Sequence, residues 1–172
     1  MIERFRTLWA RRWVRWISQA LAVLAIYGVF HSFQTRELAS GAAPELAGQT
    51  VRGATVSLGA PDGAPKVVHF WATWCGVCKA EEGTIDSFAS DRPMITVATR
   101  SGSNGAIRAY LDERGLRFDA LADPRGSVAR AWGVRAFPST FVVGADGKIA
   151  SRTVGYTTTV GLHLRYLFAP VL

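Results

Sequence analysis

Two cysteines, Cys75 and Cys78, stand where a short apolar segment gives way to a polar one. The apolar run over residues 67–71 contains β-branched and aromatic residues, which predicts a buried strand. The run that starts at Cys78 continues as Lys-Ala-Glu-Glu and predicts a helix. Unpaired backbone N–H groups and the helix dipole favour a thiolate at such a position. The cysteine pair is therefore predicted to be reactive.

The spacing of the two cysteines indicates redox chemistry. With two residues between them, one sulfur can attack a disulfide while the other resolves the mixed disulfide. The chain has no other cysteine, and its histidines (His31, His69 and His163) show no paired spacing. A structural zinc site needs four ligands, so this pattern does not favour one. A metal clip or an inert buried pair is the alternative.

The segment Trp71-Ala-Thr-Trp-Cys-Gly-Val-Cys-Lys resembles the active-site motif of the thioredoxin superfamily. With its apolar N-terminal segment, the chain is most similar to the membrane-anchored periplasmic branch of TlpA-like, DsbE-like and ScsD-type proteins. The resemblance covers roughly Gln49 to the C-terminus. It implies a thioredoxin-like α/β fold, with a central mixed sheet flanked by helices and an N-terminal β-hairpin. It also implies a protein disulfide oxidoreductase that needs no cofactor besides its own disulfide.

The patterns along the chain agree with that fold class. Strands are expected at 67–71, 94–99, 116–121, 137–143 and 149–154, and a leading hairpin at 49–58. Helices are expected from Cys78 to about Ser90 and over 104–114, 127–132 and 158–168. Alternating strands and helices predict a sheet that is covered on both faces.

The substrate-binding residues are implied by the same resemblance. Cys75, at the helix entrance, is the expected nucleophile, and Cys78 resolves. Trp71 and Trp74 are expected to frame the site, and the dipeptide Gly76-Val77 separates the cysteines. A proline that leads into a strand belongs at its start or at an edge. In the superfamily the proline in this context is cis and shapes a groove for an extended peptide, which assigns that role to Phe137-Pro138.

Two residues are candidate proton acceptors for the thiols. Glu81 lies six positions after Cys75, which matches a partly buried acid in reductases of this branch; the alternative is a solvated glutamate. His69 lies six positions before Cys75, where thioredoxin has a buried acid; the alternative is a strand residue hydrogen-bonded for packing. Gly83 occupies a position where related helices carry a proline.

The distribution of charge concentrates the basic excess at the N-terminus. Residues 1–36 hold six arginines and one glutamate, whereas residues 37–172 hold 14 basic and 12 acidic groups. No basic stripe with stacking aromatic residues is evident, which argues against nucleic-acid binding.

Residues 16–35 carry no charge, and as a helix they would span about 30 Å, the thickness of a bilayer's hydrocarbon core. They are predicted to form a transmembrane anchor. Five arginines precede it, so residues 1–15 are expected to be a cytoplasmic tail. The protein is thus expected to cross the bacterial inner membrane once. Residues 36–48 are expected to be a linker, and 49–172 the periplasmic domain. A signal peptide cleaved within 39–43 is the alternative.

The direction of electron flow is predicted only indirectly. An oxidising compartment already favours disulfides, so reduction of exported proteins, fed by a membrane electron donor, is the expected role. An oxidase or isomerase, a copper-handling thiol module and a non-catalytic peptide-binding domain are the alternatives.

Overall fold

The computed structural model describes residues 13, 15–26, 28–29, 35–59 and 64–169. The chain divides into two compact units, residues 1–36 and residues 37–172.

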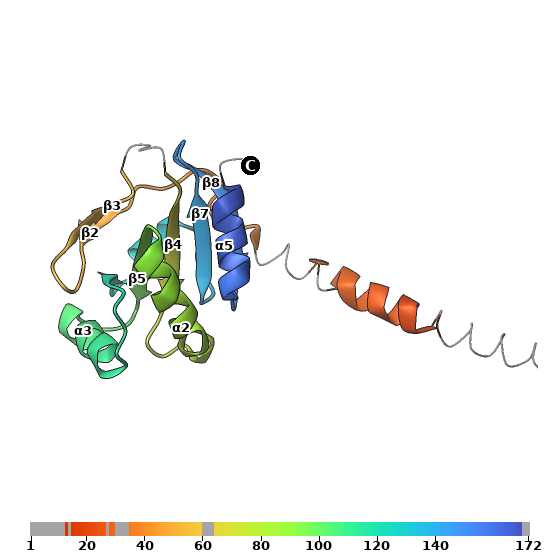
Figure 1. Ribbon diagram of the computed structural model, residues 1–172, viewed down its shortest axis with the longest axis horizontal. Helices are drawn as coiled ribbons and strands as arrows, with labels where there is room; N and C mark the ends of the chain where they lie inside the picture. The colour runs from red at the N-terminus through yellow and green to blue at the C-terminus, as the bar shows by residue number, and fades with distance from the viewer. Residues whose placement is uncertain (1–12, 14, 27, 30–34, 60–63, 170–172) are drawn as a thin grey trace, which may run out of the picture. The chain divides into compact units, whose positions relative to one another are not determined.

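The second unit is built on a six-stranded mixed sheet (Figure 1). Its strands run in the order β1-β8-β7-β4-β5-β6. Strand β4 is parallel to β5, and β5 to β6, while β7 is antiparallel to both β4 and β8. The bounds are β1 Gly41–Ala42, β4 Lys66–Trp71, β5 Met94–Thr99, β6 Ala120–Asp123, β7 Ser139–Val143 and β8 Lys148–Val154. The predicted mixed sheet is confirmed.

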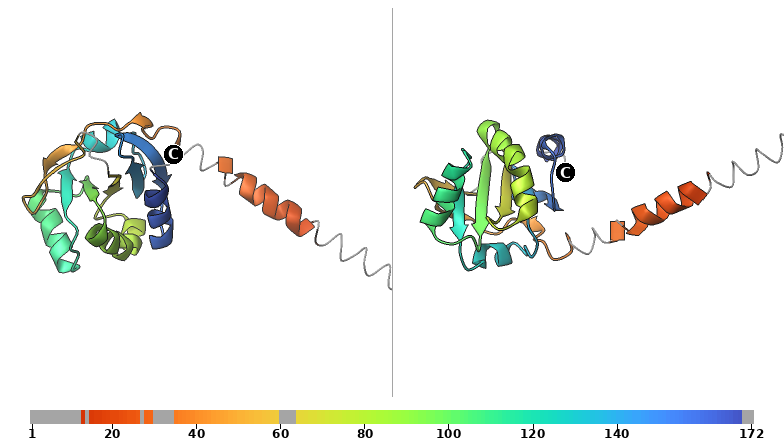
Figure 2. Two further views of the ribbon diagram at one scale, coloured as in Figure 1. Left: turned by 45° about the horizontal axis from the view of Figure 1, so that its top comes forward. Right: turned by 90° about the horizontal axis from the view of Figure 1, so that it is seen from below.

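Helices cover both faces of this sheet. They are α2 Gly76–Asp91, α3 Asn104–Glu113, α4 Ser127–Ala131 and α5 Thr159–Phe168. Figure 2 shows α2 and α5 on one face and α4 on the other.

Alternating side chains of β4 belong to two hydrophobic clusters, one on each face of the sheet. Val67 and Trp71 join a cluster with residues of α2, α3 and α5, among them Phe88, Ile107 and Leu162. Val68 and Phe70 join a second cluster on the α4 side, which contains Trp132. This period of two follows from the geometry of a strand buried on both faces.

A separate two-stranded antiparallel sheet precedes the core. Strands β2 Ala47–Gln49 and β3 Thr55–Ser57 pair with each other, which confirms the predicted hairpin close to its expected position. A bridge between Thr50 and Leu121 connects it to β6 near the start of that strand.

Residues 37–48, expected to be part of a linker, are instead packed against the domain. Leu38 and Leu46 are buried in the second cluster, and β1 pairs with the start of β8. Arg152 Nη1 donates hydrogen bonds to the carbonyls of Leu38 and Ala39, at 2.8 and 3.2 Å. The composition of this stretch is typical of a tether, but its two leucines fill the core.

Two further element boundaries differ from expectation. Helix α2 begins at Gly76 rather than Cys78, so Cys75 is its N-cap and Cys78 lies in its first turn. The strand expected at 116–121 is β6, which begins only at Ala120. Before it, Asp86 of α2 accepts hydrogen bonds from the backbone N–H groups of Arg117 and Phe118, which takes these groups out of the sheet.

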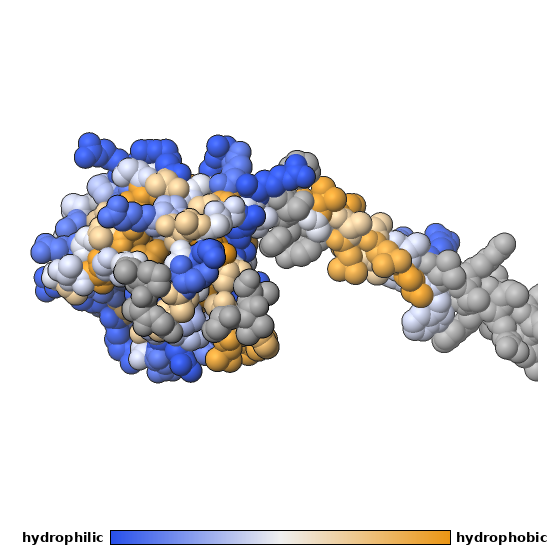
Figure 3. All heavy atoms as spheres, turned by 90° about the horizontal axis from the view of Figure 1, so that it is seen from above, coloured by the Kyte–Doolittle hydropathy of each residue, from blue (hydrophilic) through white to orange (hydrophobic). Residues whose placement is uncertain are grey.

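In the first unit, residues 15–26 are helical. Its apolar side chains lie exposed along the helix surface (Figure 3), and Trp16, Leu21 and Ile26 are 60–69% exposed. Among the residues described, no helix combines the length and apolarity of a membrane span. The predicted anchor includes residues 27 and 30–34, which lie outside the described residues, as does most of the predicted tail over 1–15.

Candidate active site

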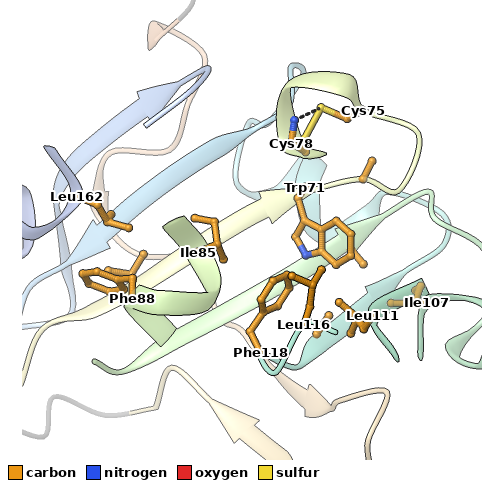
Figure 4. Packing of buried hydrophobic residues seen from close by; sticks show 14 of the residues in the cluster. Trp71, Cys75, Cys78, Ile85, Phe88, Ile107, Leu111, Leu116, Phe118 and Leu162 are labelled. Carbon is orange, nitrogen blue, oxygen red and sulfur yellow. Dashed lines mark hydrogen bonds between the residues drawn. A yellow bond between two sulfur atoms is a disulfide. The ribbon is translucent and has the colours of Figure 1, made fainter. Parts of the chain in front are cut away.

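A disulfide joins Cys75 and Cys78 at the N-terminus of α2 (Figure 4). Cys75 is the N-cap residue, and the backbone N–H of Cys78 donates a hydrogen bond to its Sγ at 3.1 Å. An N-terminal N–H of a helix has no partner within the helix. Here the cysteine sulfur supplies that partner, so the same N–H is in position to stabilise a thiolate on Cys75 after reduction.

The surface around the disulfide is apolar and exposed. Cys75 is 7% exposed and Cys78 3%, so the first cysteine is the more accessible of two buried residues. Trp74 and Val77 beside them are 60% and 48% exposed, and Gly76 is exposed as well. Exposed aromatic and aliphatic groups of this kind suit contact with another protein.

The Phe137–Pro138 peptide bond is cis, as predicted. Pro138 is buried and directly precedes β7, so its missing N–H does not interrupt the sheet. Phe137 is half-buried, and its ring meets that of Trp74 edge-on, with 5.7 Å between centroids. The residues predicted to bind substrate thus lie at the N-terminus of α2 and directly before β7.

Trp71 does not lie at the surface of the site. It is 2% exposed and belongs to the same hydrophobic cluster as both cysteines. Its indole Nε1 donates a hydrogen bond to Thr96 Oγ1 at 3.2 Å. Trp71 therefore supports the disulfide from within the core (Figure 4), while Trp74 lies at the surface.

The structure brings the two candidate proton acceptors together. His69, on β4, and Glu81, on α2, are 2% and 0% exposed, and His69 Nε2 lies 3.5 Å from Glu81 Oε1. The solvated-glutamate interpretation of Glu81 is therefore wrong. Glu81 is one helical turn beyond Cys78 on the buried face of α2.

Two threonines complete this buried polar group, and neither was predicted. Thr140 Oγ1 lies 3.0 Å from His69 Nδ1, and the backbone N–H of Thr157 donates to Glu81 Oε2 at 2.9 Å. Glu81 Oε1 has no hydrogen-bond partner among the described residues. Thr140 could have been recognised from the sequence, because a polar residue two positions after Pro138 in a hydrophobic strand indicates a buried hydrogen bond.

Burial moves the pKa values of the pair in opposite directions. Desolvation raises the pKa of Glu81 to about 7, against the smaller opposing effect of the Thr157 N–H. Desolvation lowers the pKa of His69 to about 3. Near neutral pH the histidine is therefore neutral, while the glutamate exists in both protonation states. Of the two, Glu81 has the pKa suited to exchange a proton.

Glu82, the next residue, is also buried but has a different environment. Its Oε2 accepts a hydrogen bond from Arg114 Nε at 2.6 Å, and its Oε1 accepts one from the Tyr110 hydroxyl. Its carboxylate thus fastens α2 to α3.

A cavity of about 430 Å³ borders Lys66 and Val143, at the end of the sheet opposite the cysteines. No three His, Cys, Asp or Glu side chains in the described residues are grouped so as to hold a metal ion. His31 lies outside those residues.

Known proteins are similar in sequence to this chain. The AhpC/TSA family matches residues 39–152. A "Thioredoxin-like protein" from Haemophilus influenzae is 35% identical over 123 residues, which are 70% of this chain and 73% of that protein. A "Thiol:disulfide interchange protein DsbE homolog" from Paracoccus denitrificans is 43% identical over 91 residues, 52% of this chain and 50% of that one.

A solved structure shows the same fold. It is a secreted Mycobacterium tuberculosis disulfide oxidoreductase homologous to E. coli DsbE, with 24% identity and a TM-score of 0.60 over 71% of this chain and 94% of that one. The predicted thioredoxin-like fold and the resemblance to DsbE-like proteins are confirmed. The TlpA-like and ScsD-type resemblances stay predictions.

Proposed function

Because this chain belongs to the AhpC/TSA family of thioredoxin-like proteins, and the matched region contains both cysteines and Pro138, we propose that it exchanges disulfides with exported proteins, chiefly as a reductase. The observation that carries the proposal is the Cys75–Cys78 disulfide at the N-terminus of α2. No other cofactor is required, because the disulfide itself carries two electrons.

The reaction proceeds in two exchanges. The Cys75 thiolate attacks one sulfur of a substrate disulfide, forms a mixed disulfide and releases the other substrate sulfur as a thiolate. The Cys78 thiolate then attacks Cys75 Sγ, closes the Cys75–Cys78 disulfide and releases the second substrate thiolate. The substrate gains two electrons and the domain loses two. A dithiol on a membrane electron donor would reduce the domain again.

The second exchange requires a thiolate on the buried Cys78. Burial disfavours a charged sulfur, so a nearby base must accept its proton. The Glu81 carboxylate has a pKa of about 7 and lies one turn further along the same buried face. We assign proton acceptance to Glu81, and to His69 the role of positioning it.

Substrate binding is assigned to the exposed apolar surface that surrounds the disulfide. Trp74, Gly76 and Val77 would contact the substrate from the α2 side. Phe137 and Pro138 would contact it from the β7 side, where an extended peptide would pair with the backbone that precedes β7. Trp74 and Phe137 already touch edge-on, so an incoming peptide meets one continuous aromatic surface.

The proposal places the domain in the periplasm, tethered by residues 16–35. The exposed apolar side chains of residues 16–26 support this arrangement, as do the five arginines before them. A reporter that is active only in the periplasm, fused after Leu172, should be active, and replacement of the arginines should scramble the orientation. Activity of a cytoplasm-only reporter would contradict the topology, and a mature chain that starts within 39–43 would contradict the anchor.

Trapping of substrates tests the function itself. A Cys78→Ser variant cannot resolve the mixed disulfide, so it should accumulate covalent complexes with exported proteins, whereas Cys75→Ser should accumulate none. The redox potential of the Cys75–Cys78 pair then decides between reduction and oxidation. If the trap captures nothing, and the protein neither reduces insulin nor oxidises a dithiol peptide, the oxidoreductase proposal fails.

A further inference from the structure

A cationic cavity lies beside the disulfide site, on the other side of Phe137. It has a volume of about 280 Å³, and its lining includes Thr99, Arg100, Arg130, Arg135 and Phe137. Its connection to the redox site runs through Trp74, which directly precedes Cys75. The Trp74 ring contacts the ring of Phe137, and its Nε1 donates a hydrogen bond to the carbonyl of Arg100 at 3.1 Å.

The three arginines meet few carboxylates. Within the described part of the chain, the guanidinium of Arg100 makes no hydrogen bond or ion pair, and that of Arg130 donates only to the carbonyl of Arg125. Arg135 is paired with Glu37, but both side chains are more than half exposed. Asp123 uses both carboxylate oxygens to accept hydrogen bonds from the first turn of α4. The cavity therefore retains an excess of positive charge.

Two of the guanidinium groups border the space beside Gly126. A Cβ there would lie 3.0 Å from Arg100 Nε and 3.6 Å from Arg130 Nη1. Like charges that border one space repel each other, and an anion between them would relieve the repulsion.

A buried hydroxyl without a partner adds a second, independent observation. Thr99 is 1% exposed, lines this cavity, and its Oγ1 has no hydrogen-bond partner among the described residues. Buried hydroxyl groups are nearly always hydrogen-bonded, because an unmet one costs free energy. A buried hydroxyl without a partner therefore belongs to a residue of the cavity wall, beside the guanidinium donors.

The backbone of Arg100 is held in an unusual conformation. Its φ is +50°, and it is the only residue other than glycine with positive φ in the described part of the chain. Its N–H donates to the Asp123 carbonyl at 2.9 Å, and its carbonyl accepts from Trp74. Strained residues that their surroundings hold in place are concentrated at ligand sites.

We propose that this cavity binds an acidic side chain of the substrate protein, close in sequence to the cysteine that reacts with Cys75. A carboxylate accepts hydrogen bonds from the guanidinium groups of Arg100 and Arg130 and from Thr99 Oγ1. Phe137 provides an apolar wall for the methylene groups of a glutamate. This inference rests on the proposed function and narrows its substrates to exported proteins with an acidic residue near the target disulfide.

Peptide binding to a full chain without redox activity tests the inference. The Cys75→Ser/Cys78→Ser protein is titrated with labelled peptides that contain one blocked cysteine and either glutamate or glutamine at each neighbouring position in turn. At low ionic strength, one glutamate position should increase affinity about tenfold over glutamine, and high salt should weaken this preference. When Thr99→Val, Arg100→Asn or Arg130→Gln is added to this protein, the ratio of the affinities for the glutamate and glutamine peptides should fall towards one. Asparagine suits position 100 because it tolerates positive φ.

Arg108→Gln is the matched control, because this arginine lies on α3 and pairs with Asp112. It removes the same charge and should preserve the glutamate preference. Equal affinity for the glutamate and glutamine peptides, or an equal loss in the control, would overturn the inference. Inorganic phosphate whose binding is lost in Arg100→Asn, but which leaves the glutamate preference intact at saturation, would assign the cavity to a free anion and also overturn the inference.

The proposed function is measured separately, by disulfide exchange of the intact protein with the glutamine peptide in its disulfide form. If that exchange fails while the glutamate preference is preserved, the reductase function is refuted, but the cavity remains a binding site for an acidic side chain. Normal exchange without the preference would do the reverse.

Discussion

His69 Nε2 lies 3.5 Å from Glu81 Oε1, inside the sheet–helix interface and out of reach of solvent. The two residues, 12 positions apart in the chain, thus form one buried pair. The pKa of Glu81 is raised to about 7, and that of His69 is lowered to about 3. A proton that enters the pair near neutral pH therefore resides on the glutamate.

Replacement of Glu81 by glutamine should change the pH dependence of disulfide exchange. In the wild-type protein the rate should rise with an inflection near pH 7, as the carboxylate becomes able to accept the Cys78 proton. The variant should lose this inflection and react about 10²-fold more slowly at pH 8, at the low end of the range for general base catalysis. Stopped-flow exchange with a peptide disulfide measures both.

Glu82→Gln is the matched control, because Glu82 is a buried glutamate on the same helix that binds Tyr110 and Arg114. It should lower stability and keep the inflection. If both variants retain the inflection, Glu81 has a structural role only.

The stability of the protein should depend on pH through the same pair. Glu81 binds its proton more tightly in the folded state, so its contribution to stability falls as pH rises from about 4.5 to about 7. His69 binds its proton more tightly in the unfolded state, so its contribution rises between about pH 3 and 6.5. Each pKa unit of difference corresponds to about 1.4 kcal/mol.

Relative to wild type, Glu81→Gln should therefore gain stability as pH rises towards 7, and His69→Asn should gain stability as pH falls towards 3. Urea unfolding at a series of pH values gives both curves. Parallel curves for variant and wild type would show that the group in question does not titrate on unfolding.

The two cysteines should differ in reactivity after reduction. The Cys78 N–H donates to Cys75 Sγ, and Cys75 is the more exposed of the two, so its thiolate should form at lower pH. Brief treatment with iodoacetamide at neutral pH followed by peptide mapping should find Cys75 labelled first. Earlier labelling of Cys78 would reverse the assigned roles.

Two glycines should respond in opposite ways to replacement by alanine. Gly83 is in the interior of α2, where an added Cβ meets nothing within 4 Å. Gly83→Ala should stabilise the protein by about 1 kcal/mol through helix propensity. Gly133 has φ +68°, and a Cβ there would overlap the carbonyl of Glu37. Gly133→Ala should destabilise by more than about 2 kcal/mol, and thermal melts compare the two.

Much of the redox site was predictable from the sequence because it depends on local geometry. The Cys75–Cys78 spacing places both sulfurs in one helical turn, and Pro138 marks the start of a strand. The cis form of the Phe137–Pro138 bond followed from the family resemblance.

The pairing of His69 with Glu81 was not predictable, because it depends on how α2 is rotated above β4. Glu81 and Glu82 are adjacent and both are buried, yet one faces His69 and the other Arg114. The periodicity of the helix does not predict which of two adjacent glutamates faces the sheet, because both are buried on α2. The unusual φ of Arg100 likewise arises from its contacts with Asp123 and Trp74, which are distant in sequence.

The pairing of β1 with β8 has a consequence for any shorter version of the domain. Gly41 and Ala42 occupy the outer edge of β8 opposite Ile149 and Lys148. A fragment that starts at Gln49 would leave the backbone groups of β8 at Lys148 and Ile149 without their partners in β1. It would also lack Leu38 and Leu46. An open strand edge beside an uncovered apolar surface is a template for pairing with another chain. Such a fragment would be prone to self-association, and residues 37–48 protect the intact protein from it.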